Sequence, residues 1–320
     1  MGKTCIVTVT QGDWQYLDEW IRYHLGIGVD LILIGYNGKS DEFVRLPRYG
    51  RVRYVDFSVV EGDDMYRMLS SSDDYPFSGF MDPDSTVNNW YDGYLQVKVL
   101  NLLVEYVRCF FHDIEWCCII DTDEFIDLRD GTKDINEFFS RNFPKENSSY
   151  SMLMRFYNDN GLIYNDGRPC MERFTCGNSF LDVNPSKSCW YLTKIVVNLR
   201  HPDVLANRCH VYSSHLVRLC DPMRWLFDNR KIELRHYWTK TLEEWISKLS
   251  TDNDRYYFTR FRGKIFSEFF FKEYAWNELT NEKLRAIPVL LKKYGIDYKP
   301  EVEEKDVRFV EAYKLANKIM

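Results

Sequence analysis

The chain has 320 residues, enough for one large domain or two small ones with a substantial core. Its formal charge of −6 argues against a nucleic-acid partner, and its hydrophobic content of 45% is ordinary for a soluble globular protein. The nine cysteines lack the paired spacing of a disulfide framework or a zinc site, and no apolar run reaches transmembrane length. The N-terminus enters a strand-like run without a signal peptide, so we expect a cytoplasmic protein.

The first sixty residues predict a βαβ arrangement. Residues 4–10 are rich in Val and Thr and predict a strand. Apolar residues then recur at helical spacing from Leu17 to Gly28, and His24 lies in that stripe as a packed helix residue. Residues 29–34 and 52–57 predict two further strands. Short intervals between strand, helix and strand indicate a parallel sheet.

The rest of the chain continues the alternation. The predicted elements are a helix at 88–111, a strand at 117–120, a helix at 134–143, strands at 150–157 and 194–197, and a helix after Thr241. Thr241 and Glu244 fit a capping box for that last helix. Residues 280–320 predict two charged amphipathic helices. Before this tail, residues 255–276 interleave Phe and Tyr with Arg and Lys, which suits either a membrane interface or a packed helix.

An acidic cluster, Asp121-Thr122-Asp123-Glu124, follows the apolar strand at 117–120. Carboxylates at positions i and i+2 project to the same side of an extended backbone, so Asp121 and Asp123 are candidates for holding one hard cation. Open α/β sheets bind ligands at the carboxyl ends of their strands, where this cluster is expected. The pattern is common by itself, and the acids could equally cap the next segment or lie in a solvated turn.

Seven blocks of residues carry a resemblance to a known family, and they cover about residues 4 to 250. The blocks are residues 13–30, residues 120–125, Asn160-Gly161, Glu172-Arg173-Phe174, residues 194–196, His210, and residues 236–244. In this order they resemble bacterial glycosyltransferases related to glycosyltransferase families 92 and 2. The chain departs from the family at Gly12-Asp13 and at Tyr36-Asn37, where relatives carry Asn-Glu and Asp-Asn, so recognition of the base is less well supported than sugar transfer.

The resemblance implies a GT-A fold, an α/β Rossmann-like domain with a mostly parallel central sheet and flanking helices. We assign it to residues 1–250, followed by an aromatic, basic and helical extension at 251–320. The resemblance also implies a UDP-sugar donor and a divalent metal, Mn²⁺ or Mg²⁺, held by Asp121 and Asp123. A third ligand is expected from His236 or, instead, from His210. His236-Tyr237-x-x-Lys240 is also similar to the His-Tyr…Lys segment of retaining enzymes of glycosyltransferase family 8, where the His binds metal.

Other residues receive roles by position. The candidates for contacting the donor are Gln11, Asp13, Asn37, Asp121, Lys194 and Lys240. The two lysines could add positive charge beside the phosphates or lie on a solvated surface. The helix after Thr241 would turn its N-terminus, which favours anions, toward the same phosphates. An inverting reaction needs one carboxylate as base, and the candidates are Asp159, Asp166 and Glu172.

The sequence therefore predicts an inverting hexosyltransferase, with galactose as the first candidate sugar. Its expected acceptor is a saccharide or lipid-linked saccharide in bacterial surface polysaccharide synthesis, with possible peripheral contact to the inner face of the cytoplasmic membrane. Two alternatives stay open. One is a metal-dependent nucleotidyltransferase or phosphohydrolase that uses the same acids, although the basic Gly-rich loop expected of it is missing near the first strand. The other is a non-catalytic carbohydrate-binding protein, which the aromatic content of 16% favours.

Overall fold

A computed structural model shows how the chain folds. The residues it describes are 2–10, 14–36, 40–57, 91–144, 146–177, 193–207, 210–213, 216–218, 225–226, 230–250, 277–278 and 280–296. Their contacts divide the chain into two compact units, Met1–Met154 with Asn184–Arg235, and Arg155–Val183 with His236–Met320. This division differs from the predicted boundary at residue 250, because residues 155–183 make their contacts with the C-terminal part of the chain.

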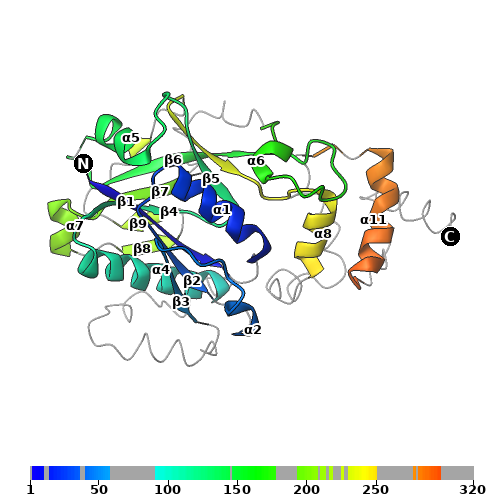
Figure 1. Cartoon of the computed structure of the whole chain (residues 1–320), viewed down its shortest axis with the longest axis horizontal. Coiled ribbons are helices and arrows are strands. Elements are labelled where there is room, and N and C mark those ends of the chain that lie inside the picture. Colours follow the sequence, from blue (N-terminus) through cyan, green and yellow to red (C-terminus); the bar gives the residue numbers. More distant parts are fainter. Residues whose placement is uncertain are drawn as a thin grey trace, which may run out of the picture. The chain divides into compact units, whose positions relative to one another are not determined.

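A mixed β-sheet forms the centre of the first unit. Among the described residues its strands follow the order β3-β2-β1-β4-β7-β6-β11-β5, with β10 paired to β6 (Figure 1). The bounds are β1 Lys3–Thr10, β2 Leu31–Tyr36, β3 Val52–Asp56, β4 Ile114–Ile119, β5 Glu124–Leu128, β6 Ser149–Phe156, β7 Thr193–Asn198, β10 Trp225–Leu226 and β11 Ile232–His236. A separate antiparallel pair joins β8 His210–Ser213 to β9 Leu216–Arg218.

The sheet is parallel over its first four strands and antiparallel next to them. β1 runs parallel to β2 and β4, and β2 runs parallel to β3. β7 is antiparallel to both β4 and β6. The predicted α/β class and the βαβ start of the chain are therefore confirmed. The antiparallel β7 between β4 and β6 makes the sheet as a whole a mixed one.

Helices cover both faces of this sheet (Figure 1). In the first unit they are α1 Trp14–Gly26, α2 Ser40–Phe43, α4 Tyr91–Phe110, α5 Ile135–Asn142 and α7 Pro202–Asn207. On one face, α4 packs Val99, Leu103 and Val107 into a core with buried residues of β1, β2, β4 and β7. This close approach depends on Gly35 of β2, since a Cβ there would lie 2.7 Å from Cγ1 of Val99.

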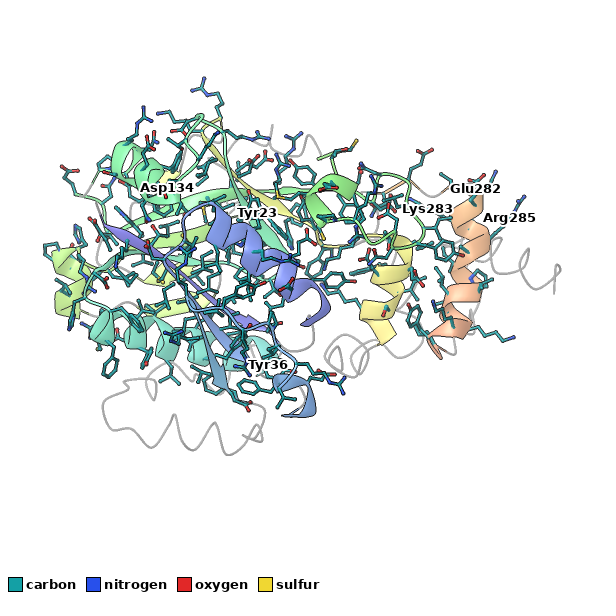
Figure 2. All side chains as sticks on the ribbon, in the orientation of Figure 1. Tyr23, Tyr36, Asp134, Glu282, Lys283 and Arg285 are labelled. Carbon is teal, nitrogen blue, oxygen red and sulfur yellow. The ribbon has the colours of Figure 1, made fainter. Side chains whose placement is uncertain are left out.

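Helix α1 lies on the other face and is bonded to β5. The indole N–H of Trp20 donates to the carbonyl of Glu124 at 2.7 Å. Tyr23 lies on the same helix (Figure 2), and its hydroxyl donates to the carbonyl of Ile126 at 2.7 Å. The helix ends at Gly26, two residues before the predicted limit. Gly28 adopts a positive φ of 94°, and the N–H of Val29 bonds back to His24, so the second strand starts at Leu31 instead of Val29.

The second unit contains α6 Cys170–Arg173, α8 Leu242–Ser250 and α11 Asn281–Lys293. Leu242, Trp245 and Ile246 of α8 pack against the apolar face of α11, which is formed by Ala286, Ile287, Leu290 and Leu291. Thr280 caps α11 and accepts a hydrogen bond from the N–H of Lys283 at 3.3 Å. The first of the two helices predicted for residues 280–320 is thus confirmed. The second predicted helix and the aromatic and basic segment 255–276 lie outside the described residues.

A buried ion pair anchors the first turn of α11 to the loop that follows β6. Lys283 lies on α11 (Figure 2). Its Nζ donates to both carboxylate oxygens of Asp159, at 2.8 and 2.6 Å, and to the carbonyl of Glu278 at 2.6 Å. The side chains of Lys283 and Asp159 are 0% and 2% exposed. The N–H of Asp159 also donates to Asn277.

Within the described residues, no helix has both the length and the apolar composition needed to cross a bilayer.

His24 is a packed residue, as predicted. Its ring lies against Trp20, Tyr23 and Phe125, Nδ1 bonds the carbonyl of Trp20 at 2.9 Å, and Nε2 accepts from the N–H of Ile126 at 3.3 Å. Nδ1 must therefore carry the proton of a neutral ring. Complete burial lowers the pKa of His24 from 6.5 to about 3, against a smaller opposing effect of the Trp20 carbonyl.

We expect His24 to make the protein lose stability as the pH falls. The unfolded chain takes up a proton at His24 below about pH 6.5, while the folded chain does so only near pH 3, so the stabilisation present above pH 6.5 is lost between these values. Between pH 7 and pH 5, the free energy of unfolding should fall by about 2 kcal/mol more in the native protein than in His24→Gln. Urea denaturation at the two pH values measures this, and equal falls in both proteins would contradict it.

Candidate functional site

The acidic cluster forms a tight turn between β4 and β5. The N–H of Glu124 donates to the carbonyl of Asp121 at 3.2 Å, and the N–H of Asp121 donates to Oε2 of Glu124 at 2.8 Å. The prediction that Asp121 and Asp123 project from an extended backbone is therefore wrong, because Glu124 closes the turn with both its backbone and its side chain. We name Asp121–Glu124 the acidic turn. Trp20 of α1, whose indole N–H donates to the carbonyl of Glu124, fixes the last residue of the acidic turn.

A buried lysine from β7 lies against this turn. Ile119 of β4 pairs with Ile195 of β7, so the antiparallel register brings Lys194 beside the residue that leads into the turn. Nζ of Lys194 forms an ion pair with Oδ2 of Asp121 and lies 3.4 Å from Oε1 of Glu124. Its side chain is 0% exposed. The alternative of a solvated surface lysine is therefore wrong for Lys194, because the strand that carries it lies in the middle of the sheet.

The electrostatic balance keeps Lys194 charged. Burial by itself lowers the pKa of a lysine, but the negative charge of Asp121, followed by that of Glu124, outweighs burial here, and the pKa of Lys194 is raised. The two carboxylates differ in their access to solvent. The side chain of Glu124 is 0% exposed and that of Asp121 is 34% exposed, so Asp121 is the more accessible of these two acids.

The acidic turn lies where an open parallel sheet is expected to bind ligands. β1 has β2 and β3 on one side and β4 on the other, and all these neighbours are parallel, so the strand order reverses between β1 and β4. Ligands of such sheets bind outside the carboxyl ends of the strands at this point. Thr10 ends β1 there, and the acidic turn follows β4. The predicted position of the cluster is thus confirmed.

The other candidates for the donor and metal lie partly elsewhere. Gln11, Asp13 and Asn37 fall outside the described residues, as does the side chain of His210, which begins β8. His236 ends β11 and belongs to the second unit, where its buried ring lies 4.8 Å from that of Phe156. Lys240 belongs to the same unit, is buried and adopts a positive φ of 53°.

The three candidate bases belong to the second unit and have different surroundings. Asp159 is held in the ion pair with Lys283. Asp166 binds Arg168 through two hydrogen bonds of 2.8 and 2.6 Å, and these bonds, ahead of the charge of the arginine, lower the pKa of Asp166. Glu172 is exposed in α6. Lysine and arginine partners hold the first two carboxylates in place, so Glu172 is the candidate with most freedom to contact a substrate.

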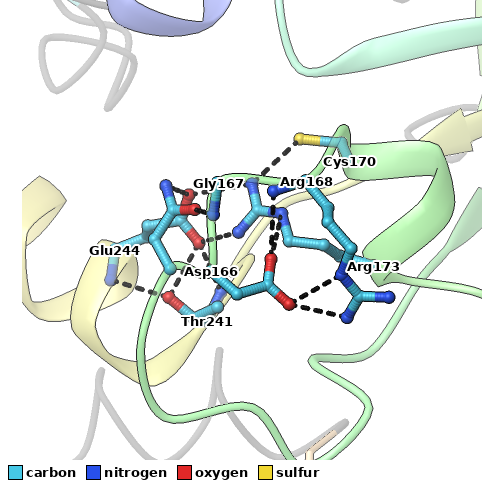
Figure 3. A network of polar contacts seen from close by, with 8 residues as sticks. Asp166, Gly167, Arg168, Cys170, Arg173, Thr241 and Glu244 are labelled. Carbon is cyan, nitrogen blue, oxygen red and sulfur yellow. Dashed lines mark hydrogen bonds and ion pairs between the residues drawn. The ribbon is translucent and has the colours of Figure 1, made fainter.

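A buried network joins the loop before α6 to the first turn of α8 (Figure 3). Arg173 donates to both carboxylate oxygens of Glu244, at 2.8 and 3.1 Å, and the Thr241 hydroxyl donates to the same carboxylate at 2.7 Å. Thr241 Oγ1 accepts from the N–H of Glu244, which confirms the predicted capping box. Burial raises the pKa of Glu244, but the bonds and charge of Arg173 outweigh burial and lower it.

The N-terminus of α8 does not offer the predicted phosphate site. The N–H groups of Leu242 and Glu243 donate to the carbonyls of Leu162 and Ile163. Those of Thr241 and Glu244 are used within the capping box. Since the chain's own acceptors take all four amides, the expectation that this helix end turns toward a diphosphate is wrong. A sequence shows the capping box but not the loop whose carbonyls complete it.

The sequence reasoning missed two residues of the acidic turn's surroundings. Glu124 was read as part of the cluster without a role, although a third acid directly after Asp-x-Asp is a visible signal for a side chain that can close a turn. Thr122 is buried in the same turn. For the burial of Lys194 there was no local signal.

Comparison with known proteins adds no family to this picture: no protein-family model matches the chain, and a search of curated proteins finds no match. The fold and the acidic turn define the chain as a mixed α/β protein with an acidic turn at the point where its sheet reverses strand order.

Proposed function

We propose that this chain is a metal-dependent glycosyltransferase of GT-A fold that moves a hexose, galactose in the first instance, from a UDP-sugar to a saccharide acceptor. One observation carries the proposal. The acidic turn, backed by a buried lysine, follows β4 at the reversal of strand order, where α/β sheets bind nucleotides. The seven ordered blocks of family-like sequence add independent support.

The donor groups available suit a divalent ion. Asp123 offers a buried carboxylate, and Asp121 adds the most solvent-accessible carboxylate of the acidic turn. Carboxylate oxygens are the ligands that Mg²⁺ and Mn²⁺ prefer. We assign Asp121 and Asp123 as ligands, with His236 as the third; His210 stays the alternative. Such an ion, when bound, neutralises the charge that develops on a leaving diphosphate.

The chain's own residues would do the remaining work. The acidic turn is fixed by Glu124 and by Trp20, which holds its carboxylates in place before a donor binds. Glu172 is the proposed base for an inverting transfer, because Asp159 and Asp166 are engaged by Lys283 and Arg168. A lipid-linked acceptor at the inner face of the cytoplasmic membrane fits the proposal, and the segment proposed to contact lipid lies outside the described residues.

A panel of nucleotide sugars tests the proposal. Purified full-length chain is incubated with Mn²⁺ and each of several UDP- and GDP-sugars, and the products are separated by chromatography. Slow release of UDP from one donor supports transfer, since water replaces the missing acceptor. Release of sugar phosphate or pyrophosphate would instead assign the chain to the phosphohydrolases or nucleotidyltransferases. Binding of saccharides without turnover of any donor would favour a carbohydrate-binding protein.

A further inference from the structure

The acidic turn contains its own cation. Three carboxylates occupy four consecutive positions, and the Lys194 ammonium is completely buried against two of them. A lysine in the middle of a sheet loses its hydration, which is costly unless carboxylates compensate. An arrangement that places such a group beside a ligand-binding turn is difficult to explain by packing, because an apolar residue would fill the strand position at lower cost.

Lys194 does not have the geometry of a phosphate-binding residue. Its side chain is 0% exposed, whereas a residue that meets a diphosphate from solution needs an accessible ammonium. The contacts of its Nζ include Oδ2 of Asp121 and Oε1 of Glu124. The other oxygen of Glu124 accepts the N–H of Asp121, so the lysine and the turn amide together engage the whole Glu124 carboxylate. The position therefore serves the acidic turn and not the donor directly.

We infer that Lys194 is a built-in counter-cation that sets the charge of the acidic turn and thereby its selectivity for a divalent ion. The inference rests on the proposed function, in which this turn binds a metal. Three carboxylates and one ammonium leave a formal charge of −2, which one divalent ion neutralises. With Lys194 absent, the charge is −3 and a trivalent ion is the better match. Lys194 is a positioning residue that also determines specificity, and the same charge holds the turn together before a metal arrives.

The measurement is the ratio of the affinities for Tb³⁺ and Mn²⁺ in full-length protein treated with a chelator. Tb³⁺ is followed by its luminescence and Mn²⁺ by the resonance signal of the free ion. Removing a unit charge a few ångströms from the ion changes the energy of a trivalent ion by half as much again as that of a divalent one. Lys194→Met should therefore raise the Tb³⁺ to Mn²⁺ ratio about tenfold or more.

Two further variants separate charge from packing. Glu124→Gln reduces the charge to −1 and should lower the ratio, while its amide oxygen can still accept the N–H of Asp121. Lys194→Met combined with Glu124→Gln restores −2 and should return the ratio to the native value. A purely structural role for Lys194 predicts no such return. If Lys194→Met does not fold, the other two variants still test the inference. A role in setting the charge predicts a lowered ratio in Glu124→Gln and a native ratio in the double variant, whereas a role in packing alone does not predict this pattern.

Lys194→Arg and Lys3→Met are the controls, and both should keep the native ratio. Lys3 begins β1 and forms an exposed ion pair with Asp113. Its loss changes the net charge by as much as the loss of Lys194, but at the amino ends of the parallel strands, away from the acidic turn. Equal ratios in the native protein, Lys194→Met and Glu124→Gln would overturn the inference while leaving the metal site intact. Failure of the native protein to bind either ion would overturn both. The expected rise in Lys194→Met and fall in Glu124→Gln, without any sugar transfer, would support the inference and reject only the proposed reaction.

Discussion

Sugar transfer at limiting Mn²⁺ is expected to fall by about 100-fold or more in Asp123→Asn, because the neutral amide removes one of the charges that hold the metal. Asp123 is the better of the two acids for this test. Asp121 forms the ion pair with buried Lys194, so Asp121→Asn removes a proposed metal ligand and also leaves a lysine short of its partner. We therefore expect Asp121→Asn to lose stability as well as activity.

The test measures initial rates of UDP release against Mn²⁺ concentration, with circular dichroism to show that each variant is folded. Asp113→Asn, an exposed acid at the amino end of the parallel strands, is the matched control and should behave as the native protein. His236→Ala should weaken Mn²⁺ binding about 10- to 100-fold, the range found when a metal shell is perturbed. Native activity of Asp123→Asn at limiting Mn²⁺ would remove the acidic turn from the metal site, and unchanged Mn²⁺ affinity in His236→Ala would remove that ligand.

The free energy of unfolding is expected to fall by about 3 to 5 kcal/mol in Lys283→Met, because the change leaves the carboxylate of Asp159 buried without its cation. Nζ of Lys283 forms an ion pair with Asp159 and donates to both of its carboxylate oxygens. The pair also fixes the first turn of α11 against the loop that follows β6. Urea denaturation followed by tryptophan fluorescence measures the loss.

Lys283→Met combined with Asp159→Asn is the matched control. Both charges are then absent, the asparagine can still accept the N–H of Gly161 as Asp159 does, and most of the lost stability should return. The single variant Asp159→Asn tests whether Asp159 is the catalytic base. If Asp159→Asn lowers the turnover rate by much more than the stability of the double variant explains, Asp159 acts on substrate. An unchanged urea midpoint in Lys283→Met would show that the ion pair contributes nothing.

The local elements were predictable from sequence because each depends on neighbours along the chain. The β-branched run of β1 predicts a strand, and the capping box of Thr241 and Glu244 predicts the start of α8. The position of the acidic turn at a strand end follows from the same kind of reasoning. These features need no knowledge of what lies across the sheet.

What could not be predicted depends on partners far apart in the chain. Lys194 meets Asp121 across 73 positions, and Lys283 meets Asp159 across 124. A lysine between Thr193 and Ile195 has the sequence pattern of an exposed side chain, and only the strand register shows that it is buried. The amides of α8 were misjudged for the same reason, since the carbonyls of Leu162 and Ile163 that occupy them come from a distant loop.

The late arrival of β7 has a consequence during synthesis. β4 and the acidic turn leave the ribosome first, and Lys194 follows 73 residues later. At about 5 to 20 residues per second, this interval lasts roughly 4 to 15 seconds. During it one edge of β4 has no antiparallel neighbour, and the three acids have only water and ions as counter-charges. Nascent chains stalled before β7 should therefore hold an acidic turn that responds to ambient cations, whereas chains stalled after it carry their own.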